Sequence, residues 1–227
     1  MKNNNVTIYI FGAGSTIARE TFKTFNQYNI IGFSKHSKIS EINEYKVLRF
    51  KNINFVKKTI EKTKTNKIVL VFMETLSIPN LVINKSQNEM EKEIKSNLIN
   101  PHNIIKKILP ILLKKKWGRI IFCGSSGALR AFPGISGYSA SKHGILGYCK
   151  ILSKEYASLG ITSNYLSLGV FKSPLVNRIN KKYIKKLLSD TDTKNYGDYN
   201  SVANAVNFII KSDYVTGSII PVDGGFN

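Results

Sequence analysis

The run "KIVLVFM" (67–73) places the strongest constraint on the fold of this chain. Its apolar residues are continuous rather than alternating with polar ones, which is typical of a strand buried on both faces of a parallel sheet. Helical patterns flank it, an amphipathic one at 53–64 and a long one at about 89–113. Parallel strands need a crossover connection, and a helix is the usual one. We therefore expect strands and helices to alternate along the chain.

The remaining segments continue this alternation. Further strand-like runs are "VTIYIF" (6–11), "YNIIGFS" (28–34), "YKVLRF" (45–50), "GRIIFCG" (118–124), "TSNYLSL" (162–168) and "GSIIPVD" (217–223). Further helical patterns run from the first glycine turn to about residue 27, over 139–159 until Gly160 ends the helix, and over 201–210. This order predicts a single domain over residues 1–227. Its fold class is α/β, a doubly wound parallel sheet of Rossmann-like type with helices on both faces.

The net charge of +20 raises the question of a nucleic-acid partner, because a dense basic surface is the usual footprint of such proteins. However, lysines outnumber arginines 29 to 5, and recognition of phosphates and bases relies on the rigid arginine fork. The abundant Lys, Asn and Ile fit the codon bias of an AT-rich bacterial genome. We expect no nucleic-acid partner, and steeply salt-dependent DNA binding would contradict that expectation.

Cysteines and histidines carry no recognisable site. Cys123 and Cys149 lack C-x-x-C spacing, and no segment reads as a signal peptide or as the ~20 apolar residues that cross a bilayer. We expect a reduced, cytoplasmic protein with no membrane partner. His36, His102 and His143 are scattered without metal-ligand spacing, so we expect no metal site.

A glycine turn, "FGAGSTIARE", joins the first strand to the first helix. Glycines suit such a turn because it is tight and because phosphates must approach backbone amides at a helix N-terminus. Gly12 and Gly14 fit this requirement, and Ser15, Thr16 and Ile17 open the helix. The turn predicts dinucleotide binding, although similar turns also occur where nothing binds.

The end of the second strand indicates which dinucleotide is bound. An acidic residue there would accept a hydrogen bond from the 2′-hydroxyl of NAD, whereas a basic one would meet the 2′-phosphate of NADP. The sequence "IIGFSKHSK" offers Ser34 and Lys35 and no acid. NADP(H) is therefore favoured and NAD(H) remains possible, since the lysine excess weakens the evidence from any single lysine.

Tyr138 and Lys142 stand four residues apart in "SGYSASKHGI" (136–145), one turn of the expected helix. Side chains at this spacing share a helix face. A neighbouring cation favours the phenolate and would lower the pKa of the phenol from its ordinary value near 10. The pair is therefore a candidate proton donor, and a chance surface pair is the alternative.

The glycine turn, followed later by "YSASK", resembles the short-chain dehydrogenase/reductase family, in particular its 3-oxoacyl-carrier-protein reductase-like members. The resemblance is densest from residue 118 onward and includes the tail "YVTGSIIPVDGG". It implies a catalytic set of Asn97, Ser125, Tyr138 and Lys142 that reduces a ketone to a secondary alcohol, or the reverse. Tyr138 would be the general acid/base, Ser125 would hold the carbonyl oxygen, and Lys142 would lower the tyrosine pKa and hold the nicotinamide ribose.

The resemblance also implies roles for other segments. Gly169 and Val170 belong to its nicotinamide loop, and Phe132, Pro133, Ile135 and Leu168 would line a substrate pocket. Pro101 has no N–H to donate to the carbonyl of Asn97, four residues earlier, which favours a kink and, in the family, a water leading to the lysine. A helix merely bent to follow the sheet is the alternative. The family's usual tetramer or dimer makes a homotetramer or homodimer the expected assembly.

Several positions depart from the family pattern. The motif T-G-x-x-x-G-x-G appears as "FGAGSTIA", N-N-A-G appears as "FMET" (72–75), and the acid after the third strand is replaced by Lys51 or Asn52. P-G of the nicotinamide loop survives only as Leu168–Gly169. These changes leave open a second interpretation, a catalytically impaired binding or scaffold protein. The four intact catalytic positions favour the enzyme.

The segment after "GVFKSPL" carries an apolar stripe and many lysines. The stripe comprises Leu175, Ile179, Tyr183 and Leu187, widened by Val176, Ile184 and Leu188; the basic residues are Arg178, Lys181, Lys182, Lys185 and Lys186. In the resembling family this region is a mobile lid. A basic lid would suit an acyl chain on a carrier or a nucleotide-linked keto-sugar, and a solvated helix face is the alternative. The substrate stays open between a small-molecule and a carrier-linked carbonyl compound.

Overall fold

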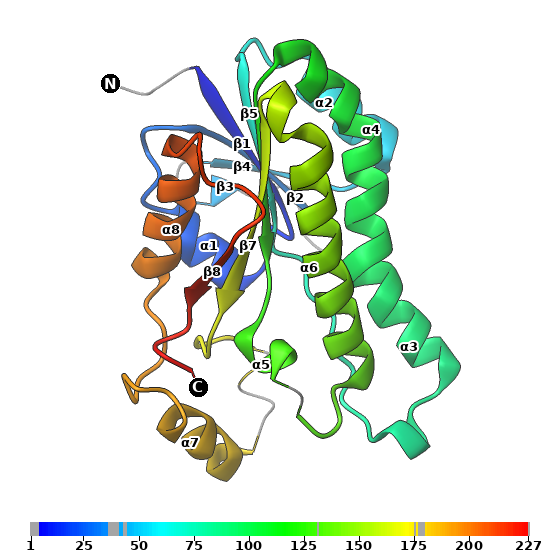
Figure 1. The fold of residues 1–227 in the computed structure, drawn as a ribbon, viewed down its shortest axis with the longest axis vertical. Helices are drawn as coiled ribbons and strands as arrows, with labels where there is room; N and C mark the ends of the chain where they lie inside the picture. The colour runs from blue at the N-terminus through cyan, green and yellow to red at the C-terminus, as the bar shows by residue number, and fades with distance from the viewer. Residues whose placement is uncertain are drawn as a thin grey trace.

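The computed structural model describes residues 5–35, 41–42 (backbone only), 45–130, 132–174, 176 and 180–226. Within these residues one eight-stranded sheet has the order β3-β4-β2-β1-β5-β6-β7-β8 (Figure 1). Its strands are β1 Val6–Phe11, β2 Asn29–Ser34, β3 Glu41–Ile42, β4 Tyr45–Arg49, β5 Lys67–Phe72, β6 Gly118–Cys123, β7 Ile161–Leu168 and β8 Ile219–Val222. All neighbours pair in parallel except β3, which is antiparallel to β4.

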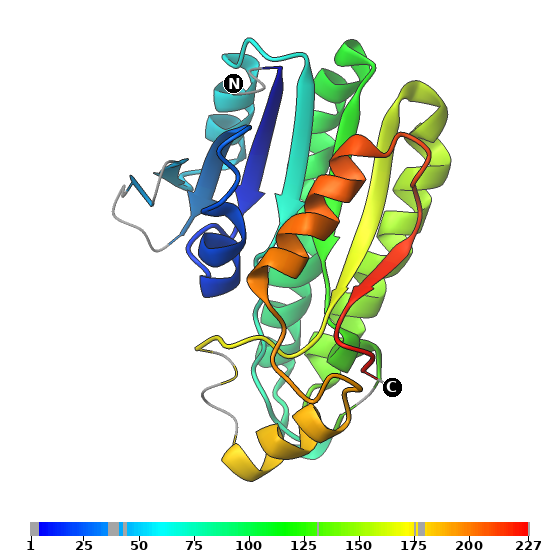
Figure 2. The same ribbon diagram turned by 90° about the vertical axis from the view of Figure 1, so that its left-hand side faces the viewer.

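Helices cover both faces of the sheet (Figure 2). One face carries α1 (Thr16–Phe22) and α8 (Tyr199–Lys211), and the other carries α2 (Ile53–Glu61), α4 (Asn100–Lys115) and α6 (Ser136–Tyr156). Helix α3 (Gln87–Ile94) runs into α4 through a π-helical turn, Lys95–Ile99. Two short helices, α5 (Ser126–Leu129) and α7 (Lys181–Ser189), lie beyond the carboxyl ends of the strands (Figure 1). The predicted doubly wound parallel sheet is confirmed.

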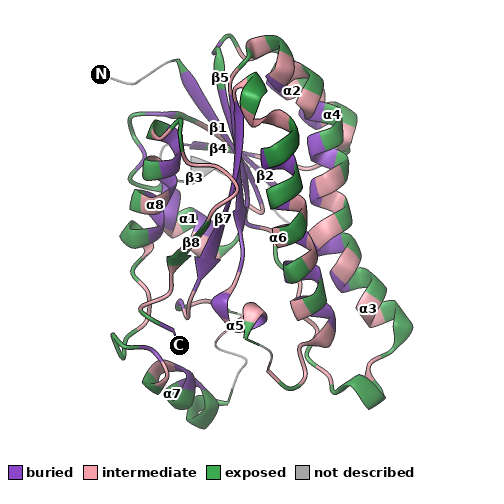
Figure 3. Cartoon of the chain, viewed as in Figure 1, coloured by how far each residue is buried: buried purple, intermediate pink, exposed green. Residues whose placement is uncertain are grey.

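Successive residues of a central strand enter opposite halves of the core, because side chains alternate across a sheet. In β1, Ile8 and Ile10 pack with α1 and α8, whereas Tyr9 and Phe11 pack with α2, α4 and α6. All four are buried, as are the neighbouring strands β5, β6 and β7 (Figure 3). Burial on both faces explains why β5 reads as a continuous apolar run in the sequence, whereas β7 also buries polar residues.

Four phenylalanines form an aromatic ladder across the ends of four adjacent strands. Phe33 of β2, Phe11 of β1, Phe72 of β5 and Phe122 of β6 occupy successive register positions. Their neighbouring ring centroids are 5.3, 4.8 and 5.3 Å apart, with interplanar angles between 14° and 21°. Stacked aromatic pairs add to the free energy gained from burial alone. The ladder closes the core just below the carboxyl edge of the sheet.

Two details differ from the sequence-based expectation. Helix α1 ends at Phe22 rather than near residue 27, because a turn in which the Phe25 N–H bonds to the Phe22 carbonyl (3.2 Å) brings Phe25 and Tyr28 into the core. The short strand β3 was not expected. Among the described residues, no helix has both the length and the apolar character needed to cross a membrane.

A buried ion pair secures the segment between β5 and α3. The Lys85 ammonium lies 2.6 Å from the Glu93 carboxylate, and both side chains are almost fully excluded from solvent. Each also binds Ile78: its N–H donates to Glu93, and its carbonyl accepts from Lys85. This pair therefore fixes the loop that follows β5 against α3.

We expect Glu93→Ala to lower the free energy of unfolding by about 3 kcal/mol, because it leaves a buried ammonium without its counter-charge. Urea unfolding of the two proteins measures the difference. Glu61→Ala is the matched control: its ion pair with Lys57 is exposed, so the expected change is below about 0.5 kcal/mol. Equal losses for the two variants would contradict the structural role given to Glu93.

Candidate functional site

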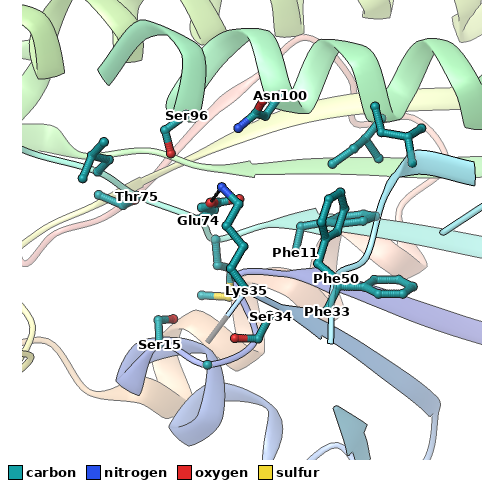
Figure 4. A pocket seen from close by; sticks show the side chains of 16 residues that line it. Phe11, Ser15, Phe33, Ser34, Lys35, Phe50, Glu74, Thr75, Ser96 and Asn100 are labelled. Atoms are coloured by element: carbon teal, nitrogen blue, oxygen red, sulfur yellow. Dashed lines mark hydrogen bonds and ion pairs between the residues drawn. The ribbon is translucent and has the colours of Figure 1, made fainter. Parts of the chain in front are cut away.

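A cavity of about 600 Å³ opens at the carboxyl ends of β1, β2 and β5 (Figure 4). Five residues that the sequence predicted to bind a cofactor line it: Gly12, Gly14, Ser15, Ser34 and Lys35. The rest of the lining comprises Phe11, Phe33, Phe50, Ile53, Met73, Glu74, Thr75, Leu76, Ser96, Asn100 and Ile104. Carboxyl ends of parallel strands are where ligands bind in sheets of this type.

The glycine turn is shaped by the strand next to it. Gly12 has a φ of +87°, and a Cβ there would lie 2.5 Å from the Glu74 backbone nitrogen. A Cβ at Gly14 would lie 2.7 Å from the Ser34 hydroxyl. Only glycine satisfies the first position, because the left-handed backbone and the close approach exclude a side chain together.

The start of α1 is capped within the chain. The Ser15 hydroxyl accepts a hydrogen bond from the Ala18 N–H at 3.1 Å. Thr16 and Ile17 form the first turn of this helix but do not line the cavity, and Ile17 packs against the core. Of the predicted turn residues, the structure thus brings Gly12, Gly14 and Ser15 to the cavity.

Lys35 meets a partner that sequence reasoning missed. Its ammonium forms an ion pair with the Glu74 carboxylate, and the two side chains converge across the cavity in Figure 4. They come from segments 39 residues apart in sequence. Glu74 lies two residues beyond the end of β5, at the same edge of the sheet as Lys35, so its nearness follows from topology rather than from a local pattern.

Three predicted catalytic residues gather beside this cavity. Ser125, two residues beyond the end of β6, lies beside the Tyr138 side chain and lowers the pKa of its phenol. Lys142 lies one helical turn further along α6, with its ammonium 5.7 Å from the centre of the Tyr138 ring. That ammonium donates to the Cys123 carbonyl (3.0 Å) and to the Thr75 hydroxyl (3.3 Å). Because Thr75 also lines the cavity, it connects the glycine turn with this group.

Burial governs the titration of this group. It raises the pKa of Tyr138, against the opposing hydrogen bond from Ser125, and lowers the pKa of Lys142 to about 8. The pKa of Tyr138 is thus raised overall, and the expected lowering by Lys142 does not govern its titration. Desolvation of the phenolate is the largest cause, and the Lys142 ammonium donates its hydrogen bonds to the Cys123 carbonyl and the Thr75 hydroxyl.

Asn97 lies in the π-helical turn and is almost fully buried. Its side-chain amide donates to the Leu76 carbonyl (2.8 Å) and the Ser141 hydroxyl (2.9 Å), and its side-chain oxygen accepts from the Leu76 N–H (2.8 Å). The side chain thereby fixes the strand end that carries Thr75 to the helix that carries Lys142. In the same turn the Asn100 N–H reaches back five residues to the Lys95 carbonyl, just before Pro101. The expected irregularity of the helix is present, and the water relay stays a prediction.

Further residues lie beside the site that no sequence pattern identified. Thr75 and Leu76 follow a buried strand, which was the available clue. Tyr165, in the middle of β7, accepts from the Ser125 N–H at 3.2 Å and occupies the space beside Gly124. Asn52, which stands near the family's missing acid, instead caps α2 by accepting from the Phe55 N–H.

The predicted nicotinamide loop lies outside the cavity. Gly169 packs against the Asp223 backbone, and Val170 packs against the buried Ile184 and Leu187 of α7. Phe132 contacts Tyr183 of α7 with ring centroids 6.2 Å apart, whereas Leu168 is buried in the main core. Lys181, Lys182, Lys185 and Lys186 are exposed, and Leu175, Arg178 and Ile179 lie outside the described residues. The apolar side of α7 therefore faces the protein and its lysines face solvent.

Cys123 and Cys149 are free and buried. No group of three or more His, Cys, Asp or Glu side chains suited to a metal ion occurs in the part of the chain that the structure describes. His143 is exposed on α6 and pairs with the Ser139 carbonyl of its own helix.

Sequence comparison with known proteins identifies relatives of this chain. A family model described as "Enoyl-(Acyl carrier protein) reductase" matches residues 51–227. A 3-oxoacyl-[acyl-carrier-protein] reductase FabG from Buchnera aphidicola (Acyrthosiphon pisum) is 34% identical, over 99% of this chain and 98% of the relative. The corresponding reductase of Rickettsia prowazekii is 30% identical, over 99% of this chain and 96% of its own length.

Solved structures agree with the fold. The ligand-free aldohexose dehydrogenase of Thermoplasma acidophilum has a TM-score of 0.85 at 23% identity, covering 98% of this chain and 94% of that protein. ElxO with NADP bound has a TM-score of 0.84 at 21% identity, covering 98% of each chain. Together with the matches in sequence, the glycine turn and the Ser–Tyr–Lys group, these results show that the chain belongs to the short-chain dehydrogenase/reductase family of oxidoreductases and resembles its 3-oxoacyl-[acyl-carrier-protein] reductases.

Proposed function

We propose that this protein reduces a 3-oxoacyl group, carried as a thioester, to the corresponding secondary alcohol, with NADPH as the reductant. The observation that carries the proposal is the pair of neighbouring side-chain hydroxyls on Ser125 and Tyr138, beside a cavity that begins at a glycine turn. Two converging hydroxyls suit a carbonyl oxygen, which accepts a hydrogen bond from one and a proton from the other.

The cavity offers a fit for a dinucleotide. Gly12 leaves no side chain between the turn and the neighbouring strand, so backbone amides at the start of α1 stay accessible to a phosphate group. The bound cofactor would supply the hydride, and the protein supplies position and charge. Lys35 and Ser34, both lining the cavity, would meet a 2′-phosphate, which supports NADPH over NADH.

The raised pKa of Tyr138 suits the reducing direction. A phenol that keeps its proton at neutral pH is ready to donate it as the substrate oxygen gains negative charge. Ser125 would hold that oxygen, and Lys142, largely charged below pH 8, would stabilise the phenolate that remains. Asn97 would be a positioning residue, because its side chain holds the Leu76 backbone next to Thr75 and does not itself contact a reactant.

The relatives support the substrate class. Their names specify 3-oxoacyl reduction, whereas the matching family model is described by an enoyl reductase, a reaction at a carbon–carbon double bond. The Ser125–Tyr138 pair favours the carbonyl, which needs an oxygen partner. The exposed lysines of α7 suit an acidic carrier protein at the cavity side. Assembly as a homotetramer or homodimer stays a prediction from the family resemblance.

We expect Tyr138→Phe to reduce the turnover of an acetoacetyl thioester by about 10²-fold or more, because it removes the proton donor. Its affinity for NADPH should stay unchanged, which binding titration checks. Tyr148→Phe, on the same helix and hydrogen-bonded to His102, is the control and should retain activity. Full activity of Tyr138→Phe, or reduction of a 2-enoyl thioester in place of the 3-oxoacyl one, would contradict the proposal.

NADPH at about 100 times its Kd should raise the melting temperature by roughly 5–10 °C, since binding to the folded state alone adds about 2.7 kcal/mol. The shift with NADH should be smaller, and Lys35→Gln should narrow the gap between the two cofactors. Absence of a shift with either cofactor at millimolar concentration would favour the impaired binding or scaffold protein over the enzyme.

We expect the stability of Lys142→Met relative to wild type to depend on pH. Because the folded pKa of Lys142, about 8, lies below its unfolded value, the unfolded chain binds the extra proton between these values and wild-type stability rises with pH there. The difference in unfolding free energy, wild type minus variant, should rise by about 3 kcal/mol from pH 7.5 to 10.5. Lys150 is exposed on the same helix, so Lys150→Met should show no such trend with pH. A difference for Lys142→Met that does not change with pH would contradict the lowered pKa of Lys142.

A further inference from the structure

The ion pair between Lys35 and Glu74 occupies the part of the cavity where the predicted phosphate contact would form. Lys35 directly follows β2, and Glu74 lies beside the glycine turn at the end of β5. Figure 4 shows the lysine side chain extending across the cavity to the carboxylate. Lys35 is thus already paired with a carboxylate of its own chain.

Hydrogen bonds on both sides of Glu74 hold its backbone in place at the cavity wall. The preceding Met73 N–H donates to the Phe11 carbonyl at 2.8 Å. On the other side, Thr75 contacts Lys142 and Leu76 is fixed by Asn97. The Glu74 side chain can rotate about its own bonds, yet its charge stays at the cavity wall whether or not Lys35 is bound to it.

The chain has few acids, which makes this one informative. Only 14 acidic residues accompany 34 basic ones, so a lysine at an exposed position is common in this chain, whereas a glutamate in the proposed cofactor cavity is unusual. The family's small residue at this place has been replaced by a carboxylate in "FMET". A carboxylate here opposes a bound phosphate unless a cation stands between them.

We propose that Glu74 is a specificity-determining residue that competes with the 2′-phosphate of NADPH for Lys35; this inference rests on the proposed function. Binding of NADPH must divert the lysine from the glutamate and leave that carboxylate near a phosphate. Binding of NADH leaves the ion pair intact, because NADH carries no 2′-phosphate. Glu74 therefore weakens the binding of NADPH but not that of NADH, and it reduces the preference for NADPH that Lys35 creates.

The size of the effect follows from exposure. The side chains of Lys35 and Glu74 are 45% and 27% exposed, so water screens the pair. Pairs of this kind contribute modestly, and removing the carboxylate charge should tighten NADPH binding by about three- to tenfold. NADH affinity should change by less than about twofold, within the range of a small change at an exposed contact.

The test is a set of dissociation constants for NADPH and NADH, measured by calorimetric titration on wild type, Glu74→Gln, Lys35→Gln and the double variant. Glu74→Gln keeps the volume of the side chain and removes only its charge. Glu61→Gln is the matched control, because Glu61 also pairs with a lysine but lies on α2 away from the cavity. Melting temperatures of all variants establish that each is folded.

Competition for Lys35 predicts that the gain in NADPH affinity from Glu74→Gln is smaller when Lys35 is already Gln. Equal gains in the two backgrounds would mean simple repulsion and overturn the competition. An unchanged ratio of the NADPH and NADH constants in Glu74→Gln would overturn the role of Glu74 while leaving the reductase standing. Failure of wild type and every variant to bind either cofactor would overturn the proposed function, and this inference with it.

Discussion

The parallel register of β1, β5 and β6 is the constraint on which the site depends. It aligns the ends of the three strands, so the residues that follow each of them meet at one edge although they are far apart in sequence. Gly12, Thr75 and Ser125 are brought together in this way, and Lys142 reaches the last residue of β6 through the Cys123 carbonyl. Burial of the sheet on both faces keeps these ends from shifting.

Sequence patterns predicted the scaffold well because burial leaves a periodic trace. The apolar run at 67–73 and the alternation of strands with helices correspond to β5 and to the layers around it. The Ser–Tyr–Lys group could be assigned only through the family resemblance, since spacing alone places Tyr138 and Lys142 on one helix face and says nothing about depth. Their burial, which raises the pKa of one and lowers that of the other, is a property of the folded chain around them.

The missed contacts that build the site join segments far apart in the chain. Glu74 lies 39 residues from Lys35, and Asn97 lies 44 residues from Ser141. No local periodicity reports such pairs, and each becomes visible only when the fold brings two strand ends or two helices together. In a lysine-rich chain the acids are better guides than the bases: Glu93 fixes the loop after β5, and Glu74 stands at the cavity.

The aromatic ladder joins the two altered motifs physically. Phe11 replaces the threonine of the glycine motif, and Phe72 replaces the first asparagine of N-N-A-G; the two rings stack with centroids 4.8 Å apart. Residues in contact do not act independently, because each substitution changes the value of the other. A polar residue restored at one position alone would face a phenyl ring with no hydrogen-bond partner. The two rings therefore act as one packing unit at the ends of β1 and β5, and a change at either position alters the packing of the other.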